Sequence, residues 1–169
     1  MKKIFLYIAG VIIFIVVVGL IVRASNSGGS LFPSRANSPF ATQDLKPIKL
    51  SSKEIKVVVA RTESEKIKGL SGIKSMPDNE GMIFDYVNLN TSPAFWMKDM
   101  LIPLDFIWIK GGQIVEIAQG APPPSPGTKD TDLQLYRPKE TIDYVLEVNS
   151  GFVSKNNILV GTKVDLSGL

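Results

Sequence analysis

Two parts of the chain differ in how apolar and polar residues are spaced. From Ile4 to Val22 the sequence holds 19 uncharged residues in a row, and the helix they would form is apolar on every face. That helix would be about 28 Å long, close to the hydrocarbon thickness of a bilayer. From Ser51 onward, short β-branched and aromatic stretches are bounded by turn residues. The first pattern predicts a transmembrane helix, and the second predicts a domain built from short strands.

Within the second part, local patterns predict about seven or eight short strands. EIKVVVAR, residues 54–61, is typical of a first strand. Thr62 and Glu65 fit a capping box that would start a short helix, with Ile67 and Leu70 facing the core. A Gly-Gly pair at residues 111–112 predicts a hairpin turn. Further strands are expected at residues 82–86, 94–99, 104–110, 113–119, 141–148 and 162–166, with a helical turn at 151–157.

These elements predict a mainly β (α+β) fold, a small compact β-barrel or sandwich with one or two short helices, preceded by a single transmembrane helix. Residues 24–50 contain SNSGGS, PSRANSP and spaced prolines. Such a segment buries too little apolar surface to fold, and it predicts a flexible linker. The expected organisation is therefore an anchor at 1–23, a linker at 24–50 and a globular domain at 51–169.

The charges that flank the apolar run set its expected orientation. Lys2 and Lys3 precede the run, and a single arginine, Arg23, follows it. The bias of basic residues toward the cytoplasm predicts a single-pass membrane protein with a cytoplasmic N-terminus and an extracytoplasmic domain. The alternative is a signal peptide whose cleavage releases a secreted domain, although the apolar core of such peptides has only about 7–15 residues. The longer run favours the anchor.

The composition narrows the chemistry that is open to the domain. The sequence contains no cysteine and no histidine, which excludes thiol nucleophiles, disulfides, Cys/His metal sites and His-based triads. Any catalysis would rely on Asp, Glu, Lys, Ser, Thr or Tyr. We expect no cofactor and no metal site.

The net positive charge belongs to the first residues of the chain. The net charge is +3, and without Lys2, Lys3 and Arg23 the remaining 16 basic residues equal the 16 acidic ones. A nucleic-acid-binding domain would need basic residues clustered within the domain itself. We therefore expect no nucleic acid partner.

The block FWMKDMLIPLDF, residues 95–106, is the strongest candidate for a site because it places charged groups among aromatic and apolar ones. If its two halves paired as a hairpin with Lys98 opposite Asp105, these residues would form an ion pair beside Trp96. The pair would then form the polar floor of a pocket, with Lys98 holding an anionic group and Asp99 nearby. Alternatively, the same pair would only close one end of the barrel.

Arg61, at the end of the first expected strand, is a second candidate because an arginine there could clamp a carboxylate or phosphate. The alternative is an ordinary ion pair with a neighbouring acid such as Glu63 or Glu147. Asp99 and Asp105 would work as an acid–base pair only if they faced one cleft at roughly 5–10 Å.

Several short motifs resemble those of domain-of-unknown-function family 192. The most specific is Phe95-Trp96-Met97-Lys98-Asp99 followed by Ile102-Pro103-Leu104-Asp105. The others, in order, are Ala60-Arg61-Thr62, Lys68-Gly69-Leu70, Gly81-Met82-Ile83-Phe84, YVLEVNSG at 144–151 and Val160-Gly161. The family usually has Met where this chain has Ser71, and Asn-Thr where it has Asp99-Met100. The resemblance implies a small, mainly β fold that is often exported, and it implies no established activity.

Together these features favour a module tethered to the membrane through residues 4–22 that binds a small polar or anionic ligand, or an envelope component, without catalysis. One alternative is an envelope hydrolase or lyase that uses Asp and Lys chemistry. Another is a structural or assembly factor that binds an envelope protein.

Overall fold

The computed structural model describes residues 38–169. The apolar run at residues 4–22 and most of the expected linker lie outside these residues. Within the described part, none of the helices is both long enough and apolar enough to cross a bilayer. The membrane anchor therefore stays a prediction from the sequence.

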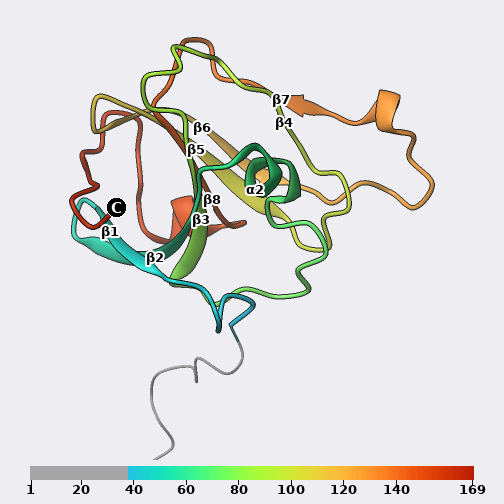
Figure 1. Cartoon of the computed structure of the whole chain (residues 1–169), viewed down its shortest axis with the longest axis horizontal. Coiled ribbons are helices and arrows are strands. Elements are labelled where there is room, and N and C mark those ends of the chain that lie inside the picture. The colour runs from blue at the N-terminus through green and yellow to red at the C-terminus, as the bar shows by residue number, and fades with distance from the viewer. Residues whose placement is uncertain (1–37) are drawn as a thin grey trace, which may run out of the picture. The chain divides into compact units, whose positions relative to one another are not determined.

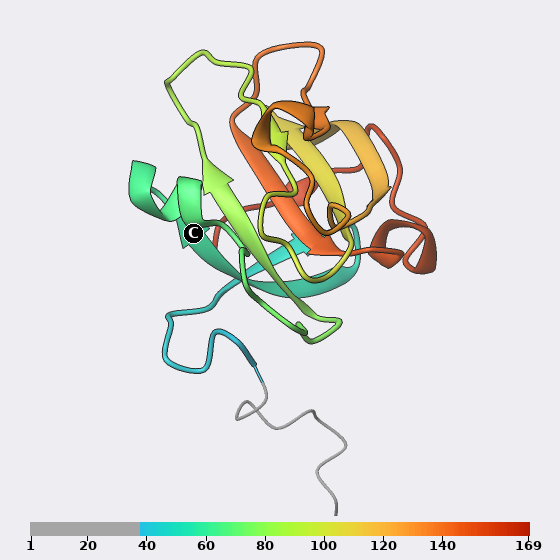
Figure 2. The same cartoon turned by 90° about the vertical axis from the view of Figure 1, so that its right-hand side faces the viewer.

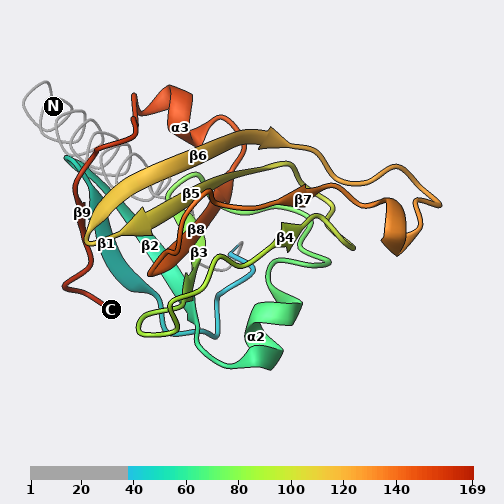
Figure 3. The same cartoon turned by 90° about the horizontal axis from the view of Figure 1, so that it is seen from above.

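The described chain folds mainly into strands, as predicted (Figure 1). Its main sheet contains, in spatial order, β6 (Gln113–Ala121), β5 (Leu104–Lys110), β8 (Tyr144–Asn149), β3 (Glu80–Asp85), β2 (Lys53–Ala60), β1 (Lys46–Leu50) and β9 (Val164–Asp165). Within it β2 and β3 run parallel, and the other neighbours are antiparallel. A separate pair is formed by β4 (Phe95–Trp96) and β7 (Leu135–Tyr136) (Figure 3). The short helices are α2 (Glu63–Lys68), α3 (Phe152–Lys155) and the 3₁₀ turn η2 (Asp130–Asp132).

The main sheet curls into a half-barrel, and the two strands at its edges approach each other at one end (Figure 2). Ile114 N donates to Thr162 O at 3.0 Å, and Val164 N donates to Gly112 O at 2.9 Å. An isolated β-bridge joins the same two segments. The expected barrel or sandwich is thus realised as one curled, partly closed sheet.

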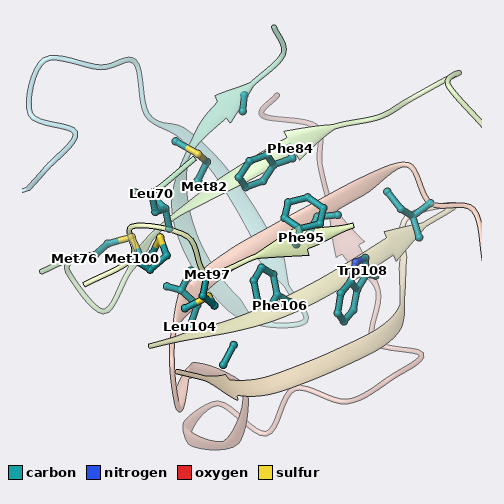
Figure 4. Close-up of a cluster of buried hydrophobic side chains, with 14 of the residues drawn as sticks. Leu70, Met76, Met82, Phe84, Phe95, Met97, Met100, Leu104, Phe106 and Trp108 are labelled. Atoms are coloured by element: carbon teal, nitrogen blue, oxygen red, sulfur yellow. The ribbon is translucent and has the colours of Figure 1, made fainter. Parts of the chain in front are cut away.

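Alternation along the central strands divides the core between the two faces of the sheet. One face carries aromatic and methionine side chains, including Met82, Phe84 and Phe106 (Figure 4). The other face carries aliphatic side chains, including Ile83 and Ile107. The central strands are therefore covered on both faces, as in sheets whose strands are near-continuous apolar runs.

The short helix after the first expected strand forms as predicted. Thr62 Oγ1 accepts from Glu65 N at 3.2 Å, and Glu65 Oε2 accepts from Thr62 N at 2.8 Å, which completes the capping box. Backbone hydrogen bonds, the largest contribution coming from Thr62, hold the pKa of Glu65 below its ordinary value. Leu70 enters the core, whereas Ile67 is 72% exposed. The expectation for Ile67 is wrong because no residue of α2 is buried, and only the chain after its Gly69 cap reaches the core.

One strand of the sheet falls inside the expected linker. β1 pairs with β2 along its whole length, and its last two residues also pair with β9. Ile48 and Leu50 are buried while Lys49 between them is exposed, which is the alternation of a half-buried strand. Pro47 lies beyond the residues that pair with β9, at an edge where a missing N–H is tolerated. The folded domain therefore begins before residue 51.

Candidate functional site

The FWMK block does not form the expected hairpin. β4 pairs with β7, and Trp96 lies opposite Leu135. β5 pairs with β6 along one edge and with β8 along the other, so it has no free edge for β4. The register that placed Lys98 opposite Asp105 is therefore wrong.

Asp105 is enclosed within the fold. Its side chain is fully buried. Oδ1 accepts from Gly120 N in β6 at 2.9 Å, and Oδ2 accepts from Val153 N in α3 at 3.0 Å. Backbone hydrogen bonds to a carboxylate are charge-assisted and strong. One carboxylate thus ties β5 to β6 and to α3.

Lys98 and Asp99 lie in the turn that follows β4. Lys98 Nζ pairs with the carboxylate of Asp130 in η2. The hydrogen bond and the charge of Asp130 hold the pKa of Lys98 above its ordinary value. Asp99 has a φ of 57°, and its carbonyl oxygen accepts from Gly72 N at 2.9 Å. Lys98 therefore has a partner of its own, and that partner is not Asp105.

Arg61 pairs with an acid outside this turn. Its Nε is 3.8 Å from Asp85 Oδ2, so the structure gives it an ordinary ion pair, but with Asp85 rather than with Glu63 or Glu147. Arg61 also lines a hollow of about 580 Å³, together with Lys68 and Glu65. That Arg61 binds an anion therefore stays a hypothesis, and this hollow is where such an anion would lie.

A buried carboxyl that the sequence suggested only as a possible partner of Arg61 lies in β8. Glu147 is the register partner of Met82 in β3 and of Phe106 in β5, and it is only 5% exposed. Burial raises its pKa to about 8. Within residues 38–169, no hydrogen bond or ion pair engages this carboxyl, and burial is the cause of the shift. Glu147 is therefore an acid without a partner inside an apolar face.

A hollow of about 160 Å³ opens beside Glu147, between α2 and β4. Phe84, Phe95 and Trp96 line it. The rings of Phe84 and Phe95 meet edge to face with their centroids 5.1 Å apart, and both lie in the aromatic cluster drawn in Figure 4. Trp96 is 48% exposed. The hollow is thus lined by a half-exposed indole, buried aromatic rings and a buried carboxyl.

On the α2 side of this hollow, Lys66 already places an ammonium group against an aromatic ring. Its Nζ lies 4.3 Å from the centroid of Tyr86 and 3.7 Å from Glu63 Oε1, and its side chain is only 7% exposed. A cation at this distance is attracted by the negative face of the ring. Burial first, and then the charges of Glu63 and Glu147, raise the pKa of Tyr86 to about 12, so the phenol stays neutral near pH 7.

The sequence signal for Glu147 is the apolar run around it. In YVLEVN of β8 the four central residues are all buried, and Glu147 is the one acid among them. Its burial follows from the placement of β8 between two other strands, which no local pattern predicts. Of the expected site residues, the structure brings only Trp96 to this hollow. Among residues 38–169, no group of three or more acidic side chains is placed to hold a metal ion.

Comparisons with known proteins agree with the resemblance described above. The model of the DUF192 family, described as "Uncharacterized ACR", matches residues 46–166. The chain is similar to the crystal structure of a proposed transcription regulator from Sinorhizobium meliloti 1021, with 26% identity and a TM-score of 0.65 over 75% of this chain and 96% of that one. It is also similar to a protein of unknown function from Novosphingobium aromaticivorans DSM 12444, with 26% identity and a TM-score of 0.65 over 81% of this chain and 99% of that one. A search among curated proteins gave no match.

The first prediction concerns the role of Asp105. In Asp105→Asn, the amide NH₂ would face one of the two backbone N–H donors, which would then lose its acceptor. We expect the free energy of unfolding to fall by roughly 2–4 kcal/mol, measured by urea denaturation followed by circular dichroism. Asp132→Asn on the exposed η2 turn is the control and should change it by less than about 0.5 kcal/mol. Equal effects of the two substitutions would contradict the structural role.

The second prediction concerns the pH dependence that Glu147 gives to stability. The pKa of this carboxyl is about 8 in the folded protein, against an ordinary value of 4.5. Between these pH values the folded state binds the extra proton, so stability falls as pH rises. The loss between pH 4 and pH 9 should approach about 5 kcal/mol, at 1.36 kcal/mol for each unit of pKa.

Glu147→Gln removes this titration, because the amide stays neutral. We expect the variant to be more stable than the parent chain at pH 9, with the difference shrinking toward pH 4, as measured by urea unfolding at each pH. Glu54→Gln, which alters an exposed carboxylate in β2, should leave the pH profile unchanged. Parallel profiles for the parent and Glu147→Gln would show that the carboxyl is not held neutral by burial.

Proposed function

The chain belongs to the DUF192 family, and from that premise we propose that its folded domain binds a small polar ligand in the hollow beside Glu147, without catalysing a reaction on it. The observation that carries this proposal is the buried Glu147 carboxyl, which lines a hollow together with aromatic rings and has no partner among the described residues. Burying such a group without a partner costs stability. A concave site with aromatic walls and a polar group of shifted pKa is the usual form of a small-molecule site.

The same geometry weakens two of the other expectations, an anion site at Lys98 and a hydrolase or lyase. An anion at Lys98 would compete with Asp130, which already pairs with that lysine. The hydrolase or lyase hypothesis loses its acid–base pair, because both oxygens of Asp105 are engaged within the fold. The hollow beside Glu147 therefore supports binding of a polar group better than it supports either alternative.

This function is tested by a thermal-unfolding screen of the full-length chain in a neutral polyoxyethylene detergent. The compounds are monosaccharides, amino acids, organic acids and small amines. A ligand present at one hundred times its dissociation constant should stabilise the chain by about 2.7 kcal/mol. We expect the shift to disappear in Glu147→Gln and to weaken in Trp96→Ala, whereas Lys98→Ala should retain it. If the thermal shifts persist unchanged in both Glu147→Gln and Trp96→Ala, this site is refuted.

We further propose that the domain lies on the extracytoplasmic side of a membrane, tethered through residues 4–22. The length of this apolar run and the lysines that precede it support the orientation. Because the chain has no cysteine, one introduced cysteine reports its own location. In intact cells, a membrane-impermeant maleimide should label Ser125→Cys in the proline-rich segment at residues 121–127, and it should not label a cysteine inserted between Met1 and Lys2, which leaves both lysines in place. The reverse labelling pattern would invert the proposed topology.

A further inference from the structure

We infer that the hollow beside Glu147 takes an organic ammonium group, which pairs with the carboxylate of Glu147 and contacts the aromatic walls. This inference rests on the proposed function and adds the chemical class of the ligand. It depends on three features of the described residues: the missing partner of Glu147, the rings around it and the size of the hollow.

The first feature is a buried acid that has no cationic partner among the described residues. Glu147 lines the hollow and forms no ion pair with any lysine or arginine of the part of the chain that the structure describes. Lys66 also lines the hollow, but its ammonium is directed to Glu63 and Tyr86 instead. An ammonium ligand would supply the positive charge that no described lysine or arginine brings to the Glu147 carboxylate.

The second feature is the set of rings. Phe84, Tyr86, Phe95 and Trp96 all line the hollow, and aromatic walls of this kind are used to hold ammonium groups. The contact of Lys66 Nζ with Tyr86 at 4.3 Å is an instance of this chemistry within the same walls. A neutral hydroxylated ring would also stack on Trp96, but it would leave the ionised form of Glu147 without a counter-charge.

The third feature is the size. The hollow measures about 160 Å³, and an engineered protein cavity of about 150 Å³ holds one benzene molecule. A trimethylammonium group is of similar size, so the hollow fits the charged head of a small amine rather than a whole oligosaccharide. The rest of such a ligand would extend past the half-exposed Trp96 into solvent.

Binding should depend on pH because the ligand prefers the ionised carboxylate. The charged or titratable groups that face the hollow with Glu147 are Glu63, Lys66 and Lys68 from α2 and Tyr86 after β3, whereas β4 contributes only aromatic rings. Glu147 has a pKa of about 8 without ligand, and Tyr86, with a pKa of about 12, stays neutral. Affinity should therefore rise with pH by up to about tenfold per unit below pH 8 and then level off.

The test compares choline with 3,3-dimethyl-1-butanol, which has the same shape but a carbon in place of the charged nitrogen. Each is titrated into the full-length chain in neutral detergent, and binding is followed by isothermal calorimetry and by Trp96 fluorescence. We expect choline to bind at least tenfold more tightly than the alcohol at pH 8.5. We also expect this preference to fall at pH 6.5.

Three variants connect this preference to the named residues. Glu147→Gln should abolish the difference between choline and the alcohol, and Trp96→Ala should weaken choline binding about three- to tenfold. Trp96 is half exposed, so Trp96→Ala should fold normally. It therefore keeps the test decisive even if Glu147→Gln, at a buried position, impairs folding. Glu54→Gln, far from the hollow in sequence and exposed in β2, should bind like the parent.

The outcomes separate this inference from the proposed function. Equal binding of choline and the alcohol, or binding of monosaccharides alone, with sensitivity to Glu147→Gln or Trp96→Ala, would overturn the ammonium class and leave the binding site in place. No binding of any of these compounds, together with no hit in the wider thermal screen, would overturn both.

Discussion

The position of β8 between β3 and β5 is the constraint on which the rest of the domain depends. Both edges of β8 are paired, and both of its faces are covered by the two parts of the core. β3 approaches so closely at Gly81 that a Cβ there would lie 2.6 Å from the carbonyl oxygen of Glu147. The absence of a side chain at Gly81 lets these strands meet, and their register then directs Glu147 into the aromatic face.

Residues 38–169 contain three buried carboxyls, and two of them, Asp105 and Glu147, are in opposite situations. Asp105 receives hydrogen bonds from two backbone N–H groups, so its charge stabilises the joint between β5, β6 and α3. Glu147 receives none and is kept neutral by its surroundings. The fold thus supplies backbone donors to one buried acid and leaves the other at a hollow, without a hydrogen bond from the described residues. The first contributes to stability, and the second is explained better by binding.

Local signals predicted much of this fold, and the failures share one physical cause. Three signals depend on residues close in sequence, and each predicted element is present in the structure. They are the capping box at Thr62, the Gly-Gly hairpin turn and the β-branched strand expected at residues 54–61, which is β2. The pairing of β4 with β7 joins segments about forty residues apart in sequence, and hydrophobic alternation does not specify such partners. Two adjacent apolar runs, such as those on either side of Pro103, favour pairing with each other as a hairpin unless other strands pair with both edges of one of them. Because β6 and β8 take both edges of β5, the expected site at Lys98 and Asp105 separates, while Trp96 still reaches a hollow.

The closure of the half-barrel has a consequence for how the chain acquires its structure. Along the chain, β1 is the first strand of the described sheet and its partner β9 is the last. The segment that bridges to the β5–β6 hairpin lies just before β9. During synthesis or passage through a narrow channel, the N-terminal strands emerge first. The edge of β1 that pairs with β9 therefore stays unpaired until β9 has emerged. Pairings between such distant segments form slowly. We therefore expect β9 to pair with β1 after the other strands of the sheet have formed, and the edge of β1 is the region that a chaperone would have to protect until then.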